Sequence, residues 1–195
     1  VWLDARAERE AEEISRALDA DVFYQTTGLP EINGALPLSK ALWLRQNEPE
    51  VFSQTHQLLL LEDYIRLFLT GESATHASLA TSTGWLDVNT GDYWQSALDA
   101  AGISRALLPQ IVPSGTDAGS LTTQAARYLG LRAGTPVFTG AMDQTAAVLA
   151  LATRENVAVE TLGTAHVVAA ATEHPVFDST KRVTIYRHAL DGKFV

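Results

Sequence analysis

The sequence has no cysteine among its 195 residues. Disulfides, thiolate catalysis and cysteine-ligated zinc are therefore excluded, and the composition fits a reducing compartment, so we expect a cytoplasmic location. No stretch approaches the roughly 20 uninterrupted apolar residues that a membrane helix needs. The run Leu58 to Leu61, for example, is broken at once by Glu62 and Asp63. We therefore expect no membrane partner.

Basic residues are also scarce. The chain carries 14 Lys and Arg against 23 Asp and Glu, which gives a formal net charge of −9. A surface this acidic repels a polyphosphate backbone, so no nucleic-acid partner is expected. A local pocket for one nucleotide stays open, because net charge says little about individual sites. With 46% hydrophobic and 19% charged residues, the composition is that of a globular protein that buries a sizeable core.

Metal-ligand spacing and a secretion signal are lacking as well. The five histidines show no close pair such as HExxH, so we interpret them as surface or strand residues and predict no metal site made of protein side chains. They are His56, His76, His166, His174 and His188. The first residues pass through Asp4 and Arg6 into an acidic segment, which is unlike a signal peptide.

Helix-like segments dominate the first two thirds of the chain. They combine helix-forming residues with apolar positions at helical spacing, and several stop at a glycine. Residues 25–37 and 73–92 are predicted as loops, the second with short strands. The predicted helices cover residues 5–18, 40–47 with Ser39 as N-cap, 49–55, a segment that follows an apolar strand end at 58–61 and stops at Gly71, 93–101 before Gly102, 104–108, and 122–129 before Gly130.

Strands appear in the last third of the chain. A strand is predicted over residues 137–140, followed by a helix of small residues at 145–152. Two further apolar strands are predicted over 157–162 and 166–172. This change of pattern indicates an α/β protein with a boundary near residue 154.

The most informative segment runs from Thr139 to Ala147. A predicted strand ends at Gly140, and a small residue and then Asp143 follow, at the point where a helix begins. Ligands of open α/β sheets gather at the carboxyl ends of strands, so Asp143 is a candidate catalytic carboxylate that faces a cleft. Asp is also a common helix cap, and the segment alone leaves both interpretations open.

A second segment, Glu160 to His166, joins the last two predicted strands. A Gly-Thr turn at Gly163 and Thr164 exposes backbone N–H groups and a hydroxyl, which suit a phosphate oxygen. An ordinary hairpin turn explains the same residues, so this segment alone does not decide between the two.

Residues 37–47 (PLSKALWLRQN) are similar to the first signature of the FGGY carbohydrate kinases. Ala35 and Ala41 depart from that signature, in which larger residues are usual. Residues 61–94 resemble the family's DYxxxxLTGE…LD…W block, with His76 where Asp is common. By itself, the first of these segments would indicate only an amphipathic helix.

Two later segments extend the resemblance. Residues 139–147 (TGAMDQTAA) resemble the GGGDNAA segment of xylulokinases and the GDQQAA segment of glycerol kinases. Residues 161–166 (TLGTAH) resemble the family's LGTSG phosphate loop. The order and spacing of all these blocks agree with the family over essentially the whole chain.

The resemblance implies an α/β fold of the actin-like (ribonuclease H-like) ATPase type, in a two-domain kinase. Residues 1–153 would form the C-terminal part of the family's sugar-binding N-terminal domain. Residues 154–195 would form the first strands of the nucleotide-binding domain. The family's DxGTxS phosphate loop, its QMHG-like acceptor segment and its glycine-rich adenosine segment are not in the sequence. The 195-residue chain alone is therefore expected to be inactive.

The resemblance also implies roles for four residues. Asp143 would be the general base, and Gln144 would contact acceptor hydroxyls. Gly163 and Thr164 would approach the phosphates of ATP, which the family uses with Mg²⁺.

The expected substrate is a small sugar, such as a ketopentose like xylulose, or a related polyol. The small side chain of Ala35 favours a sugar over glycerol. A homodimer of the complete enzyme is a further expectation. A non-catalytic actin-like binding module derived from a kinase is the alternative that remains open.

Overall fold

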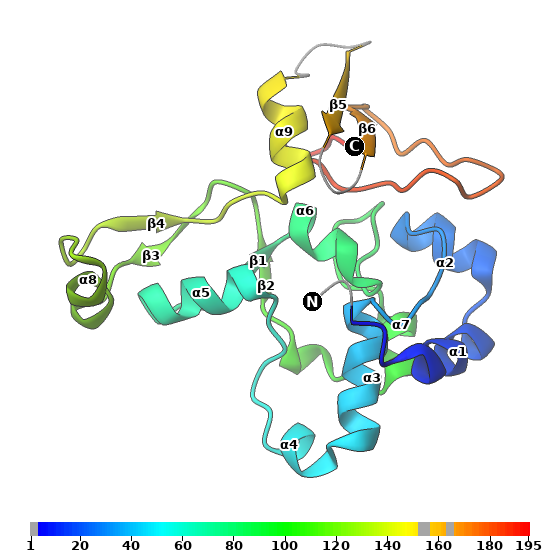
Figure 1. Cartoon of the computed structure of the whole chain (residues 1–195), viewed down its shortest axis with the longest axis horizontal. Coiled ribbons are helices and arrows are strands. Elements are labelled where there is room, and N and C mark those ends of the chain that lie inside the picture. The colour runs from blue at the N-terminus through cyan, green and yellow to red at the C-terminus, as the bar shows by residue number, and fades with distance from the viewer. Residues whose placement is uncertain (1–3, 152–156, 163–165) are drawn as a thin grey trace.

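The computed structural model describes residues 4–151, 157–162 and 166–195, in which helices, short strands and long irregular segments alternate (Figure 1). Short 3-10 helices lie at Thr81–Thr83 and Arg105–Leu107. No helix in the described ranges has the length and apolarity needed to cross a membrane. The α-helices are α1 (Glu8–Ala17), α2 (Ala20–Thr27), α3 (Pro37–Asn47), α4 (Pro49–Ser53), α5 (Leu61–Thr70), α6 (Ala77–Ala80), α7 (Gln95–Ala101), α8 (Thr123–Leu129) and α9 (Asp143–Leu151).

The strands of the described residues associate in pairs. The first pair, β1 (Ala74–His76) and β2 (Gln110–Val112), is parallel. The others, β3 (Asp117–Ser120) with β4 (Pro136–Phe138) and β5 (Ala158–Leu162) with β6 (His166–Ala170), are antiparallel. Helices and strands are thus mixed along the chain. The sequence predicts short strands within residues 73–92 and strands in the last third, but it does not predict β2 and β3.

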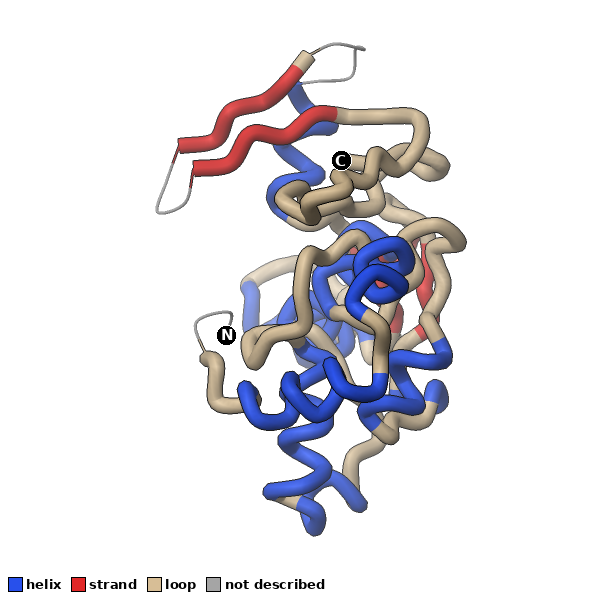
Figure 2. Tube along the Cα trace, turned by 90° about the vertical axis from the view of Figure 1, so that its right-hand side faces the viewer, coloured by secondary structure: helices blue, strands red, loops and turns tan. Residues whose placement is uncertain are grey.

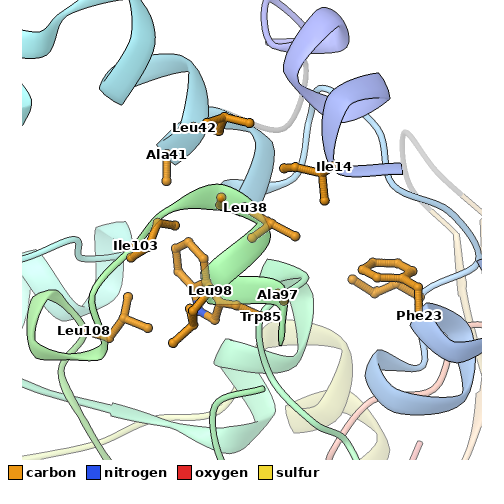
Figure 3. Packing of buried hydrophobic residues seen from close by; sticks show 12 residues of the cluster. Ile14, Phe23, Leu38, Ala41, Leu42, Trp85, Ala97, Leu98, Ile103 and Leu108 are labelled. Atoms are coloured by element: carbon orange, nitrogen blue, oxygen red, sulfur yellow. The ribbon is translucent and has the colours of Figure 1, made fainter. Parts of the chain in front are cut away.

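The largest hydrophobic core joins α1, α2, α3 and α7, and all of its buried residues lie between Ile14 and Leu108. We call the part of the chain before β2, residues 4–109, the helical body. The side chains of the core point toward one another from these helices and from the segments around Trp85 and Ile103 (Figure 3). Ile14, Leu38 and Leu98 are fully buried. Full burial of an aliphatic side chain of this size contributes about 1.5–3 kcal/mol. This core makes the helical body a firm support for the segments on its surface.

The chain after β6 returns to the helical body and packs against α2. The hydroxyl of Tyr24 donates to the carbonyl of Val183 at 2.8 Å and accepts from the amide of Asp178 at 3.0 Å. The ring of Phe177 meets Tyr24 edge-on, with the ring centroids 5.4 Å apart. Seen from the side, the β5–β6 hairpin and α9 lie above the helical body (Figure 2). The segment after β6 therefore connects the β5–β6 pair to the helical body through its contacts with α2.

Several predicted helix ends are confirmed. Gly71, Gly102 and Gly130 each follow the last residue of a helix and adopt the left-handed backbone conformation. Glycine has no Cβ that would clash in this conformation, so these ends can be predicted from local sequence. The helix α8 begins after Thr122, whose side chain accepts from the amide of Ala125.

One helix, α2, is missing from the sequence prediction. The reason is that its β-branched and aromatic residues favour strands in isolation. Asp19 caps α2 by accepting from the amides of Asp21 and Val22, and Phe23 and Tyr24 are buried. Burial and capping together outweigh the weak local propensity.

The start of α3 also differs from the prediction. The helix begins at Pro37, with Leu36 as N-cap, whereas Ser39 lies inside it. The Ser39 hydroxyl is buried and donates to the carbonyl of Asn33 at 2.8 Å. Proline suits the first helical position because its missing N–H is not needed there. The apolar residues 58–60, predicted as a strand end, form no strand.

Candidate active site at the start of α9

Asp143 is the first residue of α9 and its side chain is exposed. The preceding strand β4 ends at Phe138, so residues 139–142 separate the strand from the helix. The helix starts two residues earlier than predicted, because Asp143 itself joins the first turn, where a negative charge is favourable. The Asp143 Oδ1 atom accepts from the amide of Gln144 at 2.7 Å. Asp143 thus lies at a helix start, clear of any apolar core.

Thr139 anchors the segment that leads to Asp143. Thr139 is buried. Its hydroxyl donates to the carbonyl of Pro113 at 2.9 Å and accepts from the amide of Thr116 at 3.0 Å. The amide of Thr139 donates to the carbonyl of Thr116 at 2.9 Å. These bonds tie the end of β4 to the loop before β3.

Gln144 lines a cavity of about 600 Å³ between α9, β6 and residues 182–186. Arg182 and Tyr186 are among its polar lining residues. Burial raises the pKa of the Tyr186 phenol, and the nearby charge of Asp143 acts in the same direction. Gln144 therefore faces a cavity that offers amide, hydroxyl and guanidinium groups to a polar ligand, whereas Asp143, the residue before it, is exposed and is not among the residues that line this cavity.

Gly163 and Thr164 lie outside the described residues, so the structure does not test their predicted role. The strands on either side are antiparallel, as the sequence predicts, and Leu162 pairs with His166. His166 lines the same cavity as Gln144. The structure thus brings Gln144 and the first residue of β6 to one place.

Below the segment 140–142 lies a buried polar group that sequence analysis missed. His76, which is fully buried, bonds Glu62 through Nε2 and Ser78 through Nδ1, each at 2.9 Å. The bond from His76 is the main reason why the pKa of Glu62 lies below its ordinary value. The only sequence signal was that His76 stands where the family commonly has Asp.

Arg66 fixes Glu62 and α5 against β1. Its guanidinium donates to Asp63 at 2.8 Å, to Glu62 at 3.4 Å and to the carbonyl of Ala74. Arg66 and Asp63 are both buried. A buried carboxylate and guanidinium with these additional bonds hold the start of α5 in a defined orientation.

Metal ligands do not gather in this region. Within residues 4–151, 157–162 and 166–195, no group of three or more His, Cys, Asp or Glu side chains is placed to hold a metal ion. Mg²⁺ in kinase sites is usually held by substrate phosphates with one or two carboxylates. Such a site does not require a cluster of three protein ligands.

Comparison with known proteins identifies the family. Residues 1–150 match the N-terminal domain of the FGGY family of carbohydrate kinases. The chain belongs to this family. It is 31% identical over 193 residues to the xylulose kinase of Lactococcus lactis. The alignment covers 98% of this chain and 38% of that relative. The autoinducer-2 kinase of Escherichia coli is 32% identical over an alignment of 203 residues. This alignment covers 98% of this chain and 37% of that relative.

Solved structures of sugar kinases share the fold. The xylulose kinase of Rhodospirillum rubrum superposes with a TM-score of 0.88 and 28% identity, over 98% of this chain and 39% of that chain. The predicted fold class, the actin-like ATPase fold of the FGGY sugar kinases, is confirmed. The chain therefore spans well under half the length of the relatives it matches.

Proposed function

We propose that the complete protein is an ATP-dependent carbohydrate kinase that phosphorylates a hydroxyl group of a small sugar. The observation that supports this most is the exposed carboxylate of Asp143 at the first residue of α9, directly before Gln144, which lines the cavity. Phosphoryl transfer depends on positioning and electrostatics more than on covalent help, so one well-placed carboxylate is sufficient on the acceptor side.

In this proposal Asp143 is the general base and Gln144 binds the acceptor. The Asp143 carboxylate takes the proton of the attacking hydroxyl. The Gln144 amide has both donor and acceptor atoms, so it can orient a neighbouring sugar hydroxyl. Exposure of Asp143 allows a substrate to reach it without a change in the fold.

ATP with Mg²⁺ supplies the phosphoryl group when bound. We propose that Gly163 and Thr164 hold its phosphates through backbone N–H groups and the threonine hydroxyl. The antiparallel β5–β6 pair supports this, because His166, the first residue of β6, lines the same cavity as Gln144. The proposed domain division assigns residues 1–153 to the sugar-binding domain and 154–195 to the nucleotide-binding domain.

For the acceptor we propose a ketopentose such as xylulose, or a related polyol. Xylulose kinases are among the relatives, and an autoinducer-2 kinase is equally similar, so the names alone do not decide. Ala35, whose small side chain was the reason to prefer a sugar over glycerol, lines a separate hollow of about 620 Å³ with Lys40 and Trp85 and does not line the cavity of Gln144. Nothing in the structure bears on the predicted homodimer, and a cytoplasmic location remains a prediction from composition.

The substitution Asp143→Asn in the complete enzyme tests this function. An amide keeps the size of the carboxylate but cannot accept the proton, so turnover should fall by roughly 10²–10⁴. Acceptor binding, measured by calorimetry, should change little. The control is Asp21→Asn, which removes an exposed carboxylate from the first turn of α2 and should leave turnover unchanged. Turnover of Asp143→Asn within a few-fold of the parent would show that Asp143 is not the base.

A further inference from the structure

The segment Gly140 to Met142, which leads into α9, is held at both ends by side chains of the helical body. The amide of Gly140 donates to Glu62 Oε1 at 3.4 Å. The amide of Met142 donates to the hydroxyl of Ser78 at 3.3 Å. Both acceptors bond the same imidazole, that of His76. One side chain thus bridges the two ends of the segment.

The hydrogen-bond directions in this bridge follow from its neighbours. The amide of Leu79 donates to His76 Nδ1 at 3.3 Å, so Nδ1 must carry a lone pair. The proton of the neutral ring then sits on Nε2 and is donated to Glu62. Because Nδ1 carries the lone pair, the Ser78 hydroxyl donates to it at 2.9 Å, next to the longer bond from Leu79, and accepts from the amide of Met142. Each bond in the bridge from Met142 to Glu62 has a defined donor and acceptor.

A Glu–His–Ser arrangement is also what a serine hydrolase uses. Ser78, however, is 1% exposed and His76 is 0% exposed, so no substrate reaches the hydroxyl. The hydroxyl already makes two hydrogen bonds within the bridge. The second hydroxyl near the ring, that of Ser114, lies 3.4 Å from Nδ1. This geometry favours a structural bridge over a nucleophile.

We propose that Glu62, His76 and Ser78 are positioning residues that fix Asp143 through the backbone of residues 140–142. The proposal rests on the assignment of Asp143 as general base. A base must lie within hydrogen-bond reach of the attacking hydroxyl, and a displacement of about 1 Å can lower turnover by about 10². Arg66 bonds Glu62 at 3.4 Å, so the bridge is anchored to α5 and its buried ion pair.

The variants Ser78→Ala and Glu62→Ala in the complete enzyme test the two ends of the bridge. Each should lower kcat between about 10-fold and 100-fold, with the KM for the acceptor within a few-fold of the parent. Glu62→Gln should keep most of the turnover, because its amide oxygen still accepts from His76 and Gly140. Loss of turnover in Glu62→Gln as large as in Glu62→Ala would overturn the positioning role, because it would point to the charge of Glu62.

The matched control for Ser78→Ala is Thr27→Val. The buried Thr27 hydroxyl also donates once, to the carbonyl of Phe23 at 2.8 Å, and accepts once, from the amide of Leu29 at 3.2 Å. Its removal should lower the melting temperature about as much as Ser78→Ala does, with kcat unchanged. An unchanged kcat in Ser78→Ala would overturn the proposal, as would an equal loss of kcat in Thr27→Val.

A double variant separates this proposal from the assignment of the base. If Ser78 acts through Asp143, then Ser78→Ala should add almost nothing to the loss already caused by Asp143→Asn. Full additivity of the two losses would overturn the positioning role. High turnover of Asp143→Asn alone would instead refute the base assignment on which the proposal rests.

Discussion

Gly28 and Gly71 both end helices in the left-handed conformation, with φ of 73° and 81°. Their surroundings differ. A Cβ added to Gly71 meets nothing within 4 Å, whereas one added to Gly28 overlaps the carbonyl of Ile185 in the returning C-terminal segment. The two glycines therefore separate a local backbone requirement from a tertiary one.

We expect Gly71→Ala to lower the free energy of unfolding by about 1–2 kcal/mol, the conformational cost alone. Gly28→Ala should lower it by clearly more, because the backbone of Ile185 must also move. Urea unfolding of the two variants side by side measures the difference. Equal losses would contradict the close packing of the C-terminal segment on α2.

The fold makes the Asp178 carboxyl more acidic than usual. The Thr180 hydroxyl donates to its Oδ2 atom at 2.6 Å and is the main cause that lowers the Asp178 pKa from 3.8 to about 2; backbone amides add to the effect. A lowered carboxyl pKa stabilises the folded state above pH 3.8, and this contribution is lost as the pH falls through about 2.

The variant Thr180→Val should therefore raise the Asp178 pKa toward its ordinary value. Carboxyl titration by NMR would show the midpoint move upward. The variant should also begin to lose this stabilisation at a higher pH on acidification than the parent. A midpoint that stays at about 2 would mean that the backbone amides alone hold the carboxylate.

At the scale of elements, the position of α5 against β1 depends on a buried ion pair. Burial raises the pKa of Asp63 even beside Arg66, so this carboxylate depends on its guanidinium partner. Removal of one partner of a buried pair typically costs about 3–5 kcal/mol. We expect Arg66→Met to destabilise the protein by that amount.

The double variant Asp63→Leu with Arg66→Met should recover much of this loss, because no unpaired charge remains buried. Arg16→Met is the control, since Arg16 and Glu12 form an exposed pair and such pairs contribute at most about 1 kcal/mol. Chemical denaturation measures all three variants. A small effect of Arg66→Met would contradict the importance of this pair for the position of α5.

At the scale of the whole molecule, the chain spans 38% of its Lactococcus lactis relative. It does not contain the DxGTxS loop or the glycine-rich adenosine segment of the family. We therefore predict that the 195-residue chain alone shows no sugar phosphorylation in a coupled assay with ATP. The control is a chain that spans the full length of the relatives. Turnover by the 195-residue chain would show that the missing segments are not required.

Local sequence alone determined the helix ends at Gly71, Gly102 and Gly130, because left-handed backbone conformation is a property of single residues. The family's motifs also determined the fold class and indicated Asp143 as the candidate general base. The sequence did not indicate α2, whose formation depends on the burial of Phe23 and Tyr24.

Only the tertiary structure placed His76 between Glu62 and Ser78, under a segment more than sixty residues further along the chain. The contact of Tyr24 with Val183 crosses 159 residues in the same way. Such bonds depend on which distant backbone atoms the packed core brings within hydrogen-bond distance. Neither periodicity nor a short motif contains that information, because both describe only neighbours along the chain.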